Sequence, residues 1–230
     1  MTFHEQLARV TAADRNFLLG APVIQRCLAG DVTLDQYVAF LTQAYHHVRH
    51  TVPLMMAVGA RLPERHHWLQ EAVLHYLDEE AGHDEWILND IEHAGGDRAA
   101  AAASQPAVAT EAMIAYAYDT VMRRNPVGFF GMVHVLEGTS VALALNAADR
   151  IQSSLSLPSR AFTYLRSHGE LDKEHVNDLA RVLGRLTDAD DREAVIRCAK
   201  GIYWLYGHVF RSLEATAAAA GPLELHRRSA

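Results

Sequence analysis

The stretch at residues 168–175 reads His168-Gly169-Glu170-Leu171-Asp172-Lys173-Glu174-His175. Successive residues of an α-helix are rotated by about 100° around its axis, so His168, Asp172 and His175 would lie within roughly 60° of one another. Two imidazoles and a carboxylate on one face are typical nitrogen and oxygen ligands of iron. The stretch therefore predicts a helix with a metal-binding face.

A second stretch, Glu80-Ala81-Gly82-His83, brings a carboxylate and an imidazole close together in the sequence. On a continuous helix, residues three or four positions apart share a face. Glu80 stands three residues before His83, and Glu79 stands four before it, so either carboxylate could bind a metal together with His83. The sequence favours Glu80 and leaves Glu79 as the alternative.

Glu137 is the third candidate position, because it follows a largely apolar segment at residues 128–136. A buried carboxylate is unfavourable unless a metal, a cation or a raised pKa compensates for it. We therefore expect Glu137 to bind metal. His134 lies three residues earlier on the same predicted face, and we expect it to support the ligands or the packing rather than to coordinate.

The predicted ligands are three carboxylates and three imidazoles: Glu80, His83, Glu137, His168, Asp172 and His175. Two ferrous ions carry four positive charges, and three carboxylates leave one of these for a hydroxide or a substrate carboxylate to balance. A single iron would need fewer protein ligands. The ligand set thus favours two irons.

Helical patterns dominate the rest of the chain, and alternation typical of strands is absent from the sequence. Helices are expected over about 3–19 and 22–29, and Thr33 followed by Gln36 has the spacing of a capping box at the start of a long helix. Pro53 should kink or end that helix. We expect one all-α domain over residues 1–230, a compact bundle of about seven helices, with a disordered tail at about 223–230.

Composition limits the classes of partner. The chain has 230 residues, a hydrophobic fraction of 50% and a formal net charge of −7, which argues against nucleic acid and anionic membranes as partners. It has neither a recognisable export signal nor a run of about 18 apolar residues. Its two cysteines, Cys27 and Cys198, fit a reducing cytoplasm better than a disulfide framework. We expect a cytoplasmic protein with a small-molecule substrate, and a homodimer as the common oligomeric state.

These motifs resemble the heme-oxygenase-like diiron oxidases, a family of iron-containing redox enzymes that includes the CADD-like proteins and shares its fold with TenA-like and PqqC-like proteins. The resemblance follows helix order through nearly the whole chain: an acid and a histidine (Glu80, His83), a glutamate on a middle helix (Glu137), and a His-x3-Asp-x2-His helix. It implies a heme-oxygenase-like helical bundle that binds two irons and uses O2 to oxidise an amino acid or a fatty acid. The particular substrate and reaction are not implied.

The chain departs from the family pattern near its first ligands. Some relatives place the first acid seven residues before the first histidine, where this chain has Tyr76. Others add an acid from the preceding helix, where this chain offers His46, His47 and His50. Tyr76, His47 and His50 are therefore candidates for substitute or supporting positions around the metals.

Three alternative functions are compatible with the same fold. A TenA-like thiaminase or hydrolase would need a cysteine nucleophile, for which the chain offers only Cys27 and Cys198. Heme oxygenation would need an early axial histidine, and His4 lies close to the start of the chain. A binding protein could keep the metal or ligand site without turnover.

Overall fold

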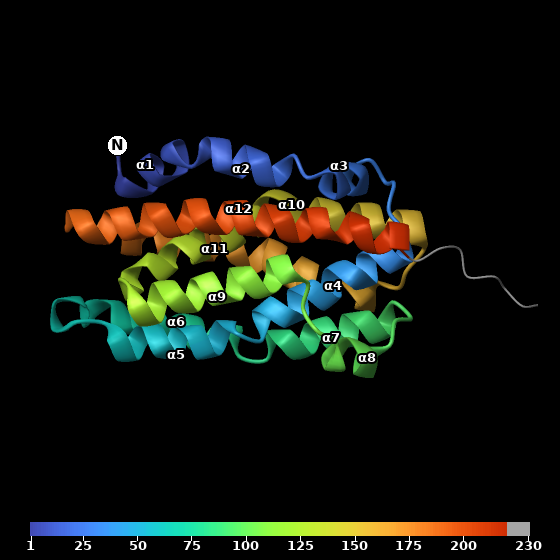
Figure 1. Ribbon diagram of the computed structural model, residues 1–230, viewed down its shortest axis with the longest axis horizontal. Coiled ribbons are helices and arrows are strands. Elements are labelled where there is room, and N and C mark those ends of the chain that lie inside the picture. The colour runs from blue at the N-terminus through green and yellow to red at the C-terminus, as the bar shows by residue number, and fades with distance from the viewer. Residues whose placement is uncertain (220–230) are drawn as a thin grey trace, which may run out of the picture.

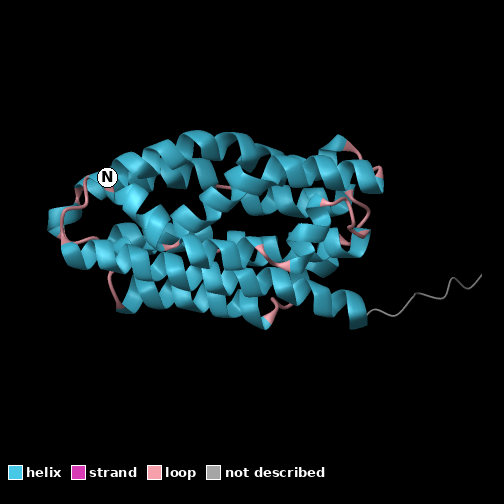
Figure 2. Cartoon of the chain, turned by 90° about the horizontal axis from the view of Figure 1, so that it is seen from above, coloured by secondary structure: helices cyan, strands magenta, loops and turns pink. Residues whose placement is uncertain are grey.

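The fold is helical throughout the part of the chain that the computed structural model describes, which is the backbone of residues 1–219 and the side chains of residues 1–169 and 175–214. Within these ranges the regular structure is entirely helix, as Figure 2 shows, so the all-α prediction is confirmed. The predicted tail at 223–230 lies outside the described residues. The α-helices are α1 (Phe3–Val10), α2 (Ala12–Leu19), α3 (Pro22–Leu28), α4 (Leu34–Val48), α5 (Thr51–Arg61), α6 (Trp68–Glu80), α7 (His83–His93), α8 (Arg98–Ala103), α9 (Val108–Arg123), α10 (Phe129–Leu155), α11 (Thr163–Gly184) and α12 (Ala189–Ala219). Short 3₁₀ helices precede α6, α10 and α11: η1 (Glu64–His66), η2 (Pro126–Gly128) and η3 (Ser159–Phe162).

The helices are more numerous and shorter than the seven expected, because several predicted helices are interrupted. The segment 3–19 divides at Thr11 into α1 and α2. The predicted capping box does form at the start of α4, where Thr33 Oγ1 accepts from the Gln36 N–H at 3.2 Å and Gln36 Oε1 accepts from the Thr33 N–H at 3.0 Å. That helix ends before Pro53, which lies in the first turn of α5, where its missing N–H leaves no intrahelical bond unmade.

The helices form an elongated bundle, with α1 to α3 along one edge, α12 beside them, and α5 to α8 along the opposite edge (Figure 1). Helix α10 contacts both α11 and α12. Its Gly131 permits the close approach to α12, because a Cβ there would collide with the backbone carbonyl of Val195. The long helix α10 thus packs between α11 and α12, and α10 and α11 carry candidate metal ligands.

Helix α10 is also long and largely apolar. Within the described residues, one helical stretch, Pro126–Leu155, is long and apolar enough to cross a membrane by length and composition alone. However, 67% of its most apolar window is buried inside the molecule, and it carries the buried side chains of His134 and Glu137. These features are those of a helix in the core of the molecule.

Candidate metal centre

A break in the helix, rather than one continuous helical face, brings Glu80 and His83 together. Glu80 is the last residue of α6 and His83 the first of α7, and Gly82 between them has φ 89° and ψ 3°. This left-handed conformation is unfavourable for residues with a Cβ and suits glycine. The expectation that the two side chains share one helical face is therefore wrong. Their proximity arises because the chain turns sharply at Gly82.

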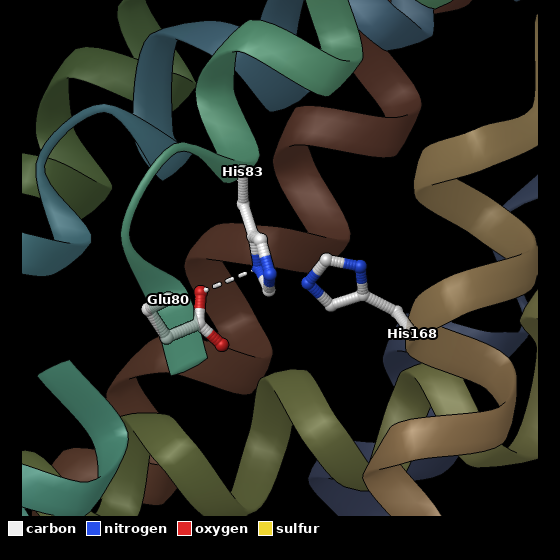
Figure 3. Close-up of side chains that lie close together, drawn as sticks. All are labelled: Glu80, His83 and His168. Carbon is white, nitrogen blue, oxygen red and sulfur yellow. Dashed lines mark hydrogen bonds and ion pairs between the residues drawn. The ribbon is translucent and has the colours of Figure 1, made fainter. Parts of the chain in front are cut away.

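Glu80, His83 and His168 form a compact group of ligand atoms. One ligand atom from each lies within 4.8 Å of the other two, and Figure 3 shows the three side chains pointing toward one another from α6, α7 and α11. Glu80 Oε2 lies 3.2 Å from His83 Nδ1, and the His83 and His168 rings meet edge to face with centroids 4.7 Å apart. We call this set the Glu80 group.

Hydrogen bonds orient both imidazoles of the Glu80 group. His168 Nδ1 lies 3.0 Å from the Tyr164 carbonyl oxygen, which can only accept, so Nδ1 carries the proton and Nε2 is left with its lone pair. Likewise, the Glu80 carboxylate accepts from His83 Nδ1. Histidines that bind metals commonly donate their other N–H to a carbonyl or a carboxylate in this way. The residues present therefore fit a metal ion.

The charge state of Glu80 also suits metal binding. Burial by itself disfavours the charged carboxylate, but the hydrogen bond from His83 and the neighbouring His168 and His175 outweigh burial and lower its pKa below the usual value. Glu80 is thus ionised at neutral pH even though it is largely enclosed. An anionic oxygen beside two imidazoles is a favourable position for a divalent cation.

A second group of potential ligands surrounds His175. His175 Nε2 lies 3.1 Å from Glu79 Oε2, and its Nδ1 lies 4.0 Å from Glu137 Oε1. His175 and Glu137 are both buried, and the buried ring of Tyr76 lies 6.0 Å from the His175 ring. We call Glu79, Glu137 and His175 the His175 group. Asp172, predicted on the same face of α11, lies outside the residues whose side chains are described.

An apolar cavity of about 160 Å³ adjoins both groups. Glu80, Glu137 and His168 contribute to its wall, and most of the remaining wall is hydrophobic. One side is a face of α10 on which the wall residues recur at helical spacing: Glu137, Ser140, Ala144, Ala147 and Ile151. The described wall residues include neither lysine nor arginine. A molecule with an apolar body could therefore lie here with one end at the carboxylates.

The three supporting histidines occupy different surroundings. His50 Nδ1 lies 3.1 Å from the Tyr118 hydroxyl, whereas the wholly buried His47 contributes to the cavity wall. His134 instead packs its ring against His4 of α1, with centroids 5.5 Å apart. Burial, with His4 and Arg15 nearby, lowers the pKa of His134 to about 4, so this histidine is neutral at pH 7.

Sequence reasoning treated Glu79 and Glu80 as alternatives, but the two carboxylates lie in different groups. The signal for this arrangement is Gly82, because a break there redirects His83 away from the helix that carries both glutamates. The apolar cavity was not predicted. Its wall is built from α3, α4, α5, α6, α10, α11 and α12, and no local pattern records how those helices meet.

Comparison with known families and structures identifies the class of this protein. A family described as iron-containing redox enzymes matches residues 38–207, and the chain belongs to this family. Its fold is accordingly the heme-oxygenase-like bundle that the motifs resembled. A search among curated proteins finds no match to the sequence.

Solved structures agree with this fold. A domain of unknown function with a heme oxygenase-like fold from Shewanella denitrificans is 25% identical, with a TM-score of 0.84 over 95% of this chain and 96% of that one. A CADD-like protein of unknown function from Nostoc punctiforme is 16% identical, with a TM-score of 0.73 over 94% and 96%. A TenA homologue from P. horikoshii is 9% identical, with a TM-score of 0.76 over 93% and 98%. The last two likenesses show a shared fold alone.

Proposed function

We propose that this protein is an O2-dependent non-heme oxidase or oxygenase that holds two irons and acts on a small organic substrate. The observation that carries the proposal is the pair of ligand groups beside an apolar cavity. Each group combines carboxylates with imidazole, the donor types that iron takes in such enzymes. Membership of the iron-containing redox family supports iron as the metal.

Iron, when bound, would supply the redox chemistry with O2, and the protein would supply orientation and exclusion of water. The Tyr164 carbonyl fixes His168 so that Nε2 is the nitrogen available for coordination, and Glu80 fixes His83 in the same way. The apolar wall beside these ligands limits the access of water to them. The chain thus provides what such a reaction requires, which is a set of oriented ligands in a pocket from which water is excluded.

The cavity favours a substrate with an apolar chain, such as a fatty acid, over an amino acid. The α10 face from Glu137 to Ile151 spans 14 residues, or about 21 Å of helix, and it is mostly apolar beyond Ser140. An amino acid would cover little of this apolar face, so most of the wall would be left without contact. A fatty acid would place its carboxylate near the irons and its chain along α10.

A TenA-like cysteine mechanism is less well supported. Cys27 does contribute to the cavity wall, but burial raises the pKa of its thiol to about 11, so the reactive thiolate is scarce at neutral pH. Cys198 is fully enclosed, and burial raises its pKa to about 12. For both cysteines the pKa is raised, whereas an activated nucleophile needs a lowered pKa. For heme oxygenation, His4 is not among the described cavity residues, since its ring lies against His134.

The decisive experiment loads the protein with Fe²⁺ without air and then admits O2. We expect two irons per chain, O2 consumption that a fatty acid stimulates, and a transient visible absorption. The double variant His168→Ala/His175→Ala should lose iron, whereas His67→Ala, at an exposed histidine, should bind iron as the wild type does. Absence of iron uptake, or uptake unchanged in the double variant, would contradict the proposal.

Iron uptake without O2 consumption in the presence of a series of fatty acids and amino acids would favour a different class of protein. In that case the chain would bind the metal or a ligand without turnover. Release of an amine or alcohol from a thiamin-like substrate without iron would favour the TenA-like hydrolase.

A further inference from the structure

His47 is a buried histidine whose polar atoms have no partner in the described protein. It lies near the end of α4, with 3% of the residue exposed. Neither ring nitrogen makes a hydrogen bond to any described group. Burying a polar group without a partner is unfavourable, and most buried polar atoms in proteins are satisfied. Such an orphaned imidazole indicates that a ligand completes its surroundings.

The neighbouring histidines, His46 of α4 and His50 just before α5, have hydrogen-bond partners elsewhere. His46 Nε2 lies 2.8 Å from Ser104 Oγ, and His50 Nδ1 lies 3.1 Å from the Tyr118 hydroxyl. The three histidines at positions 46, 47 and 50 thus have distinct surroundings. Only His47, among these three, contributes to the wall of the cavity.

His47 faces the same space as the Glu80 group. Glu80, His168 and His47 all contribute to the cavity wall, and His168 and Glu80 are near enough to His47 to affect its pKa. The Tyr206 ring meets His47 edge to face at 5.7 Å and helps to hold its plane. The ring therefore faces the same cavity as Glu80 and His168, from a helix that supplies none of the other ligands.

The chemistry of this imidazole suits a metal. Burial, with His168 nearby, lowers the pKa of His47 to about 4, so the ring is neutral at pH 7 and one nitrogen carries a lone pair. Neutral imidazole is a common ligand of iron, cobalt and zinc. In contrast to a carboxylate, it would add a ligand without reducing the positive charge of the ion.

We propose that His47 is a nitrogen ligand of the metal ion that Glu80, His83 and His168 hold. The inference rests on the proposed function to the extent that it assumes a metal at this group. It assigns three imidazoles and one carboxylate to that ion. The His175 group, with its larger share of carboxylate, would then hold an ion in a different ligand field.

The test uses Co²⁺ as a spectroscopic probe in the full-length chain without air. His47→Leu removes the imidazole and keeps an apolar side chain of similar size. We expect Co²⁺ affinity at one site to fall about tenfold or more and the visible absorption of that site to change. His47→Ala should behave in the same way, and added imidazole should restore part of the original spectrum. His46→Ala is the matched control and should retain wild-type binding.

A second readout separates a lost ligand from a damaged fold. Without metal, His47→Leu should be as stable as the wild type or more so, because an unsatisfied buried group has been removed. With Co²⁺, its melting temperature should rise less than that of the wild type. Wild-type Co²⁺ affinity and spectrum in His47→Leu would overturn the inference and leave the proposed function intact. The same would follow if the variant weakened only the binding of a fatty acid.

Failure of the wild type to bind Co²⁺ or Fe²⁺ would be a different result. It would overturn the proposed function and the role of His47 together. The comparison of wild type with variant therefore distinguishes the two failures.

Discussion

Glu79 and Glu80 are adjacent in the sequence, yet their carboxylates contact different imidazoles. Glu79 Oε2 lies 3.1 Å from His175 Nε2, whereas Glu80 Oε2 lies 3.2 Å from His83 Nδ1. Consecutive residues of a helix are rotated by about 100°, so the end of α6 directs one carboxylate toward each ligand group. The two glutamates thus contribute one carboxylate to each group, and the other members of the groups come from α7, α10 and α11.

Glu79→Gln and Glu80→Gln should therefore each reduce iron binding from two ions per chain to about one. An amide is a neutral and weaker oxygen donor, so the ion at the affected group loses charge compensation. Iron per chain after anaerobic loading and gel filtration measures this effect. Glu71→Gln, on an exposed turn of the same helix, is the control. If each variant lost both ions equally, the two ions would instead depend on each other for binding.

Gly82→Ala should destabilise the protein by about 1 kcal/mol, because the left-handed backbone at this position is strained for alanine. It should also weaken iron binding, since relaxation of the break would move His83 away from Glu80. Urea unfolding and iron titration measure the two effects. Gly184→Ala, at a helical glycine with open space around its Cα, should be neutral or stabilising. Unchanged stability and iron binding in Gly82→Ala would contradict this account of the break.

Asp191→Ala should lower the free energy of unfolding by about 3–5 kcal/mol without a direct effect on the ligands. Asp191 is fully buried and its carboxylate lies 2.6 Å from His66 Nε2 and 2.7 Å from Asn125 Nδ2. Its loss would leave these donors unpaired where η1, η2 and α12 meet. Asp190→Ala, at the exposed neighbouring position, should cost much less in the same denaturation experiment. Similar losses in the two variants would refute the role of the buried cluster.

Stability should fall on acidification partly because of His134. Its pKa in the folded state is about 4, below the ordinary value of 6.5, so between these values the unfolded chain binds more protons than the folded one. The contribution of His134 to the free energy of unfolding is therefore fully present above pH 6.5 and is lost as the pH falls toward 4. The loss between pH 8 and pH 5 should be about 2 kcal/mol. Urea unfolding of His134→Gln should show a correspondingly smaller loss. His67→Gln should keep the wild-type dependence, and an unchanged dependence in His134→Gln would argue against the assignment.

Ala147→Phe should slow the oxidation of long-chain substrates and leave iron binding intact. Ala147 contributes to the cavity wall three helical turns from Glu137, so a phenyl ring there would fill the distal part of the space. O2 consumption across saturated fatty acids of increasing length measures the effect, which should appear only with the longer chains. Ala142→Phe, at an exposed position of the same helix, is the control. Equal rates with all chain lengths would exclude this path for the substrate.

The sequence by itself determined the class of fold, because helical periodicity, the capping box at Thr33 and the breaks at glycines and prolines are local signals. It also indicated the ligand types, since His168 and His175 share a face through helical geometry alone, whatever the rest of the fold does. Only the tertiary structure decided which ligands meet. The positive φ of Gly82 turns His83 toward Glu80, and the cavity arises where six helices converge on α10. Contacts between residues far apart in the sequence depend on how whole helices pack, and no local pattern encodes that packing.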